Sequence, residues 1–243
     1  MKILDPRAVQ ILFAVVEEYI ATAVPVGSLE LAQKYRIDAS SATIRNDMAR
    51  LEDEGFLEQP YTSAGRVPTD KAYRLYLEQC SSEPSVLSNH AVRKLTAMID
   101  QFKRHQQFSD QEIFLKSVAK EVAEMTKDLV VVEFEPNDVF YTGLAHLLEQ
   151  PEFEYIQAVT PIGRMIDEVD EMVTQLRRLC REDVEILIGN QNPIDRHFSV
   201  IVGRYRIGSA ARGIFGLIGP TRMPYERNIA LVRFIQDQLS RIA

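Results

Sequence analysis

The stretch SSATIRNDMARLEDEG, which runs from Ser40 to Gly55, constrains the fold of this chain more than any other segment. A serine at its start can cap a helix, and apolar side chains recur four and three residues apart at Ile44, Met48 and Leu51. Gly55 suits the left-handed position that ends many helices. The stretch therefore predicts a short helix that buries one stripe and exposes the opposite face.

Two helices are predicted before this one and a β-hairpin after it. Residues 6–23 carry an apolar stripe, and residues 28–35 follow the break AVPVGS, with Ser28 as the predicted N-cap. The segments FLEQP and RVP flank the polar tip YTSAG and carry prolines that suit edge strands. A further helix is predicted over 70–80. This order is typical of a winged helix-turn-helix domain, which we place at residues 1–81.

The exposed side of the helix after Ser40 has the chemistry of a reader of the DNA major groove. Asparagine pairs with adenine, arginine pairs with guanine, and alanine or threonine methyl groups meet the thymine methyl. The helical repeat places six such residues on or beside this face: Ala42, Thr43, Arg45, Asn46, Ala49 and Arg50. If the hairpin is a wing, its Arg66 can enter the minor groove, whereas an arginine of an ordinary hairpin is only a solvated charge. A solvated polar helix explains this helix alone equally well, so the prediction depends on the elements around it.

The charge of the chain restricts how it can bind nucleic acid. The whole sequence carries a net charge of −7, which excludes general attraction to polyanions. Residues 1–79 contain nine Lys or Arg and twelve Asp or Glu, a net charge of −3, so a single copy is poorly suited to tight DNA binding. Two copies on a symmetric site ease this problem. The acidic run of Glu52, Asp53 and Glu54 lies in the final helical turn, which can point away from the groove.

The remaining residues predict a helical segment and a second domain. The linker SSEPS begins at Ser81, and residues 82–127 contain two amphipathic helices, whose stripes can pair between two chains or pack on their own domain. Residues 128–243 mix apolar strand runs such as DLVVVEF and FSVIVGRYRI with helices near 143–148, 165–179 and 225–242. The fold class is therefore α+β.

The sequence contains no pattern that requires catalysis. The two cysteines and four histidines have no metal-ligand spacing, the glycines of GIFGLIGP lack the lysine of a phosphate loop, and no nucleophile motif is present. We therefore expect no enzyme activity, no metal and no cofactor. The apolar runs are strand-sized and the N-terminus has no signal pattern, so a cytoplasmic protein without a membrane partner is expected.

Several long motifs resemble the HrcA family of heat-inducible transcription repressors. They are PVGS, SSATIRNDMARLEDEGFLEQPYTSAGRVPTDKAYRLY, YTGLAHLLEQPEF and IGPTRMPYERNIALV, in the family's order. The resemblance implies a winged helix that represses chaperone genes at an inverted-repeat DNA operator, a GAF-like second domain, a homodimer, and the chaperonin GroEL as a partner. It also places Ser41, Thr43, Arg45 and Asn46 in the recognition-helix motif, and Ser63, Gly65 and Arg66 in the wing motif.

The chain departs from this family in its middle. DLVVVEFEPNDVFYTGL closes in a few residues a region that is much longer in other members, so a compact GAF-like domain without the usual dimer contact is implied. Two other functions stay open. One is a winged-helix regulator that senses a small ligand through the GAF-like domain, and the other is a protein-interaction module that never touches DNA.

Overall fold

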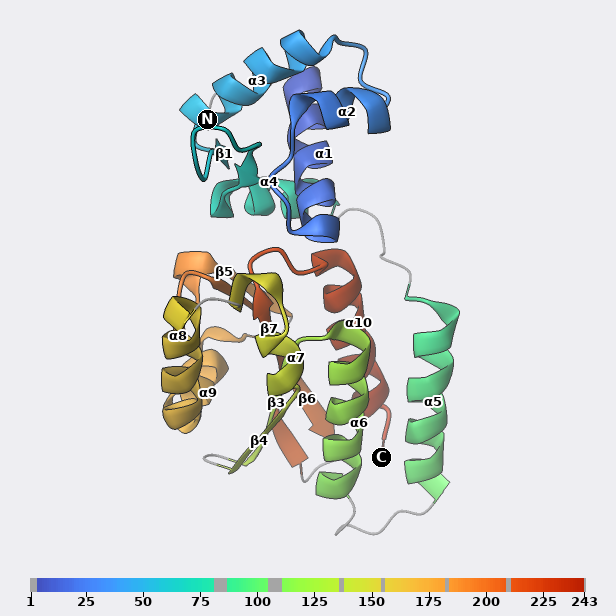
Figure 1. Ribbon diagram of the computed structural model, residues 1–243. Coiled ribbons are helices and arrows are strands. Elements are labelled where there is room, and N and C mark those ends of the chain that lie inside the picture. The colour runs from blue at the N-terminus through green and yellow to red at the C-terminus, as the bar shows by residue number, and fades with distance from the viewer. Residues whose placement is uncertain are drawn as a thin grey trace. The chain divides into compact units, whose positions relative to one another are not determined.

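The computed structural model describes residues 4–80, 87–104, 111–135, 138–153, 156–181, 184–208 and 211–242 (Figure 1). The chain divides into two compact units, Met1–Glu83 and Pro84–Ala243. The predicted linker SSEPS lies outside the described residues. Among the described helices, none is both long and apolar enough to cross a membrane.

Over residues 4–80, the first unit contains four helices and one two-stranded antiparallel sheet. In chain order they are α1 (Pro6–Thr22), α2 (Ser28–Lys34), α3 (Ser41–Asp53), β1 (Leu57–Glu58), β2 (Val67–Pro68) and α4 (Asp70–Cys80). This order matches the order of elements predicted from the sequence. The core is formed by side chains from all of the helices, among them Ile11, Leu12, Leu31, Ile44, Leu51 and Tyr73.

Residues that flank α1 and α2 show how the chain folds locally. The side chain of Asp5 accepts a hydrogen bond from the Ala8 amide at 2.9 Å, and Pro6 follows at the first helical position. The prediction that Ser28 caps α2 is wrong. Gly27 occupies the cap in an extended conformation without a side-chain bond, and Ser28 is the first helical residue and is buried.

The second unit is built on a five-stranded antiparallel sheet with the order β4-β3-β7-β6-β5. The strands are β3 (Leu129–Glu135), β4 (Asp138–Thr142), β5 (Glu185–Ile188), β6 (Phe198–Ile207) and β7 (Ala211–Pro220). The helices are α5 (Asn89–Arg104), α6 (Gln111–Thr126), α7 (Leu144–Leu148), α8 (Ile156–Asp167), α9 (Val169–Leu179) and α10 (Tyr225–Ser240), with short 3-10 turns at Pro151–Phe153 and Gly189–Gln191.

Helices cover both faces of this sheet (Figure 1). An apolar cluster joins α8 and α9 to one face, and it includes Val131, Val173, Leu176, Val202 and Ile214. Helices α6 and α10 lie on the other face, and α5 packs against these two helices. The predicted stripes of α5 and α6 are thus buried within this chain, with Leu95, Ile99, Phe114 and Val118 all buried.

The structure differs from the predicted elements in the region around residues 138–179. Strand β4 and helix α8 were not predicted, and the helix expected over 165–179 is two helices that meet at Glu168. Glu168 has φ −112° and ψ 25°, which breaks the helical path. Pro161 inside α8 removes a backbone donor and obscured the helical pattern.

Candidate nucleic-acid interface

Helix α3 is fixed at both ends by the residues that the sequence indicated. The Ser40 hydroxyl accepts a hydrogen bond from the Thr43 amide at 3.1 Å, and Gly55 has φ +74°, in the left-handed region. The stripe of Ile44, Met48 and Leu51 is buried. Because these three side chains anchor the helix, its opposite face is held toward solvent in one orientation.

The predicted DNA-binding residues of α3 lie mainly on that outer face. Ala42, Arg45, Asn46, Ala49 and Arg50 are exposed, whereas Ser41 and Thr43 at the first turn are half-buried. No ion pair or hydrogen bond holds the Arg45 side chain among the residues the structure describes. Its guanidinium is therefore available to an external acceptor.

Asp47 is a carboxylate on α3, and a count of charges does not show whether it faces solvent or the interior. It is 4% exposed, and Arg7 of α1 donates to its Oδ2 through Nε at 2.8 Å. This hydrogen bond raises the pKa of Arg7. Arg50 donates to Asp47 Oδ1 at 3.4 Å and also lies 3.4 Å from Asp5 Oδ2. The acid is thus turned inward and neutralised, and Arg50 is less free than Arg45.

The hairpin after α3 is held in place by backbone contacts. Val26 and Arg66 exchange two backbone hydrogen bonds, each at 2.9 Å. A Cβ at Gly65 would lie 2.4 Å from the Val26 carbonyl oxygen, so this approach requires glycine. The Gln59 amide donates to the carbonyls of Thr62 and Ala64 and shapes the loop, which leaves Ser63 exposed.

Arg66 lies against the acidic end of α3. Its Nε is 2.8 Å from Glu52 Oε2, and the side chain is 18% exposed. The N–H does not point at the carboxylate well enough to make a hydrogen bond, so the contact is an ion pair. The pair fastens the hairpin to α3 and neutralises one acid of the run that made this helix unusual for DNA binding.

A groove of about 420 Å³ separates the start of α2 and the outer side of α3 from the hairpin. It brings together Arg45, Ser63, Gly65 and Arg66 from the predicted set. Ala42, Asn46 and Ala49 are exposed on α3 but do not line this groove. The arrangement offers one free guanidinium, a hydroxyl and loop backbone along a single concave surface, which suits contacts to a phosphate backbone.

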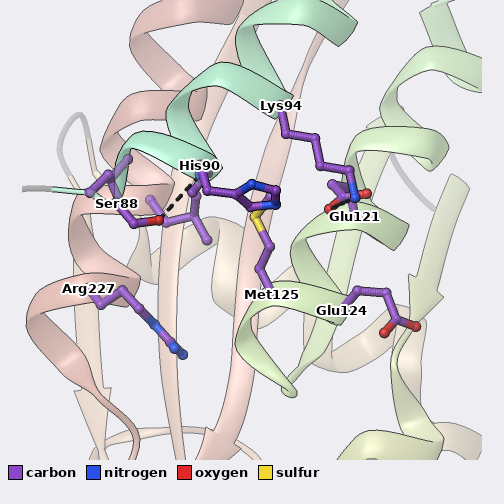
Figure 2. A pocket seen from close by; sticks show the side chains of 10 residues that line it. Ser88, His90, Lys94, Glu121, Glu124, Met125 and Arg227 are labelled. Carbon is purple, nitrogen blue, oxygen red and sulfur yellow. Dashed lines mark hydrogen bonds and ion pairs between the residues drawn. The ribbon is translucent and has the colours of Figure 1, made fainter.

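A second cavity, of about 430 Å³, lies between α5, α6 and α10 in the other unit. Figure 2 shows Arg227 and His90 pointing into it, with Lys94 paired to Glu121 across it at 2.6 Å. Glu124 is also neutralised, because Lys127 lies 3.0 Å from its carboxylate. Two of the three lining carboxylate and ammonium charges thus neutralise one another, and the third, Glu124, is paired with a lysine outside the cavity. Among the described residues no three His, Cys, Asp or Glu side chains gather as a metal site requires.

A small helical unit with a hairpin beside its third helix, joined to a larger α+β unit, has the layout of a two-domain transcription regulator. The family model described as HrcA protein C terminal domain matches residues 79–229. The chain belongs to the HrcA family, whose curated members are named heat-inducible transcription repressors.

Individual relatives agree with this assignment. The chain is 29% identical to "Heat-inducible transcription repressor HrcA" of Thermodesulfovibrio yellowstonii, over 98% of this chain and 97% of that protein. It is 28% identical to the repressor of that name from Caldanaerobacter subterraneus, with the same two coverages. The first alignment spans 339 residues, so about a hundred of its positions have no counterpart in this chain of 243.

A solved structure titled as a hypothetical protein shares the fold. Its TM-score is 0.79 at 21% identity, and the match covers 98% of each chain.

Proposed function

We propose that this chain is a sequence-specific DNA-binding repressor of heat-shock or chaperone genes, which acts by occupying an inverted-repeat operator. The observation that carries the proposal is the outer face of α3, where Arg45 and Asn46 are exposed and Asp47 is turned inward. A groove walled by phosphates would repel an exposed carboxylate on this face. Withdrawal of Asp47 into an ion pair with Arg7 removes that repulsion.

In the proposed complex the residues of the first unit divide between base reading and positioning. Asn46 pairs with adenine, Arg45 pairs with guanine, and the methyl groups of Ala42 and Ala49 meet thymine. The remaining predicted residues, which are Ser41, Thr43, Arg50, Ser63 and Gly65, hold the unit against the phosphates. Arg66 belongs to this second group only if it leaves Glu52, because the ion pair keeps it against α3.

The electrostatics of the first unit supports a homodimer as the form that binds the operator. Four of the nine basic side chains of the first unit, Arg7, Lys34, Arg50 and Arg66, are engaged with Asp47, Glu18 or Glu52. One copy therefore presents few free cations, and the affinity for phosphate grows with the number of phosphates contacted. Two copies on a two-fold operator double that number. Because the stripes of α5 and α6 are buried within the chain, the dimer contact is assigned to neither stripe.

We assign residues 1–81 to the winged helix, 82–127 to connecting helices, and 128–243 to a shortened GAF-like domain. The five-stranded antiparallel sheet with helices on both faces supports this GAF-like assignment. No reaction is assigned to either unit. The family resemblance supports the chaperonin GroEL as a partner and the cytoplasm as the location.

The test is a fluorescence anisotropy titration of the full chain against an inverted-repeat chaperone operator and a scrambled duplex of equal length. Arg45→Ala and Asn46→Ala should each weaken operator binding by about 1–3 kcal/mol and reduce the preference for the operator. Arg74→Ala is the matched control, because Arg74 is an exposed arginine of α4 outside the groove.

Two readouts separate this proposal from the alternatives. Light scattering should give two chains per operator, and binding should weaken steeply with salt. If Arg45→Ala lowered the affinity for scrambled DNA as much as for the operator, α3 would not read bases. Binding that is absent at low salt would instead favour a protein-interaction module.

A further inference from the structure

The sheet face beneath α9 ends in a row of charged residues. The register of β3 against β7 places Glu133 beside Ile214, and Ile214 lies opposite Arg204 of β6. These three residues therefore share one face of the sheet. Two residues further along β6, Arg206 lies opposite Arg212 of β7 on the same face. The apolar layer under α8 and α9 therefore gives way to three arginines and one carboxylate.

Two of the arginines near this row have structural partners. Arg204 donates through Nε to the Cys180 carbonyl at 2.8 Å, and through a terminal nitrogen to the Arg177 carbonyl at 2.7 Å. It thus caps the C-terminal end of α9. The side chain of Arg177 lies 3.2 Å from Glu133 Oε1. Both guanidinium groups are fixed in place, and both still lie beside the charged row of Glu133, Arg206 and Arg212.

Arg206 and Arg212 have no such partners. Both are exposed, and neither forms an ion pair or hydrogen bond among the residues the structure describes. Like charges directly opposite one another on neighbouring strands destabilise a sheet. A pair of facing arginines at a strand end therefore costs stability unless an anion comes between them.

The carboxylate in this row adds a second observation. Glu133 is 1% exposed, and its Oε1 has an ion pair but makes no hydrogen bond. Burial raises the pKa of Glu133, while the charge of Arg177 opposes that rise. A buried acceptor without a hydrogen bond at the edge of an arginine-lined surface can receive a donor from a bound molecule.

These side chains line a cavity of about 370 Å³, whose walls are Glu133, Arg177, Arg204, Arg206, Arg212 and the β-strand backbone at Gly213. Ligand pockets in proteins span about 300–1,000 Å³, so a small metabolite fits and a folded macromolecule does not. A Cβ at Gly213 would lie 1.7 Å from the Glu133 carbonyl oxygen, so glycine is what allows β3 and β7 to come this close.

We propose that this cavity binds a small organic anion with at least two negative charges, either a phosphoryl compound or a polycarboxylate. The forks of Arg206 and Arg212 clamp the anionic group, because planar guanidinium groups bind phosphate and carboxylate oxygens in pairs. A hydroxyl or amine elsewhere on the ligand donates to Glu133. This site lies wholly within the second unit and does not depend on the DNA-binding proposal.

The test is isothermal titration calorimetry of the full chain with pyrophosphate and, separately, with citrate in a low-chloride buffer. Arg206→Gln and Arg212→Gln should each weaken the anion that binds by at least tenfold. Arg178→Gln is the matched control, because Arg178 is an exposed arginine of α9 that does not line the cavity, and it should stay within twofold. Without ligand, both cavity variants should melt at the same temperature as the parent chain or higher, because a like-charge contact is relieved.

Each outcome decides the proposal. Binding of pyrophosphate alone identifies a phosphoryl ligand, and binding of citrate alone identifies a polycarboxylate. No binding of either anion at millimolar concentration overturns the site, as does an equal loss in Arg178→Gln, which would mean diffuse attraction. The affinity of Arg206→Gln for the operator should equal that of the parent chain. A lower operator affinity, together with no anion binding by the parent chain, would mean that these arginines contact DNA, and it would overturn the small-molecule proposal.

Discussion

Replacement of Asp128 by asparagine should make the second unit more stable, and increasingly so as the pH rises. Asp128 directly precedes β3 and is 2% exposed, and Asn228 of α10 donates to its Oδ2 at 2.7 Å. Burial raises the pKa of Asp128 to about 7, although the charges of Arg227 and Arg222 and the hydrogen bond from Asn228 oppose the rise. Asparagine keeps an acceptor for that bond and carries no charge.

The size of the effect follows from the pKa difference between the folded and unfolded chain. The ordinary value is 3.8 and the folded value is about 7, so the folded state holds one more proton over about three pH units. Each unit corresponds to about 1.4 kcal/mol, and about 4 kcal/mol of stability is lost as the pH rises from 4 to 7. From about pH 8 upward both states are ionised and the loss stays constant.

Urea unfolding followed by circular dichroism at pH 6, 7 and 8 measures this dependence while staying above the isoelectric point of about 5.3, where low net charge favours association. The stability advantage of Asp128→Asn over the parent chain should grow by about 1 kcal/mol between pH 6 and pH 8. Asp167→Asn, at an exposed aspartate of α8, should show no such growth. A constant gap between Asp128→Asn and the parent chain would refute the reasoning.

Two further variants test the first unit. Glu52→Gln should release Arg66, raise the affinity for scrambled DNA and steepen the salt slope by about one; anisotropy titrations at several salt concentrations that give the parent slope would contradict the role of the ion pair. Gly65→Ala should destabilise the hairpin by about 1–3 kcal/mol, since its Cβ would meet the Val26 carbonyl. Gly27→Ala, where a Cβ meets nothing within 4 Å, is the control, and an equal loss in both urea unfolding curves would rule out the clash.

The first unit was largely predictable because its signals are local. The cap at Ser40, the buried stripe from Ile44 to Leu51 and the stop at Gly55 each depend on residues within one or two helical turns, and all are confirmed. The inward turn of Asp47 was not predictable, because it depends on Arg7, forty residues earlier in the chain. A count of charges cannot separate a carboxylate that faces solvent from one that an arginine of another helix has neutralised.

The candidate anion site could not be found from the sequence for the same reason. Arg206 and Arg212 are six residues apart, but the register of β6 and β7 places them opposite one another. Glu133 joins them only because β3 pairs with β7. Strand pairing over such separations is set by the whole sheet, whereas the missed helix α8 reflects a local ambiguity that Pro161 created.

The strand order of the second unit also governs how the chain can be made. Leu129 of β3 pairs with Ile218 of β7, which is synthesised 89 residues later, whereas β4 supplies a partner for the other edge at once. At about 5–20 residues per second, β3 emerges several seconds before β7 exists. During that interval the side chains from Leu129 to Val132, all buried in the finished sheet, have no complete cover. The yield of native protein from each round of translation therefore depends on how well the cell shields one unfinished strand.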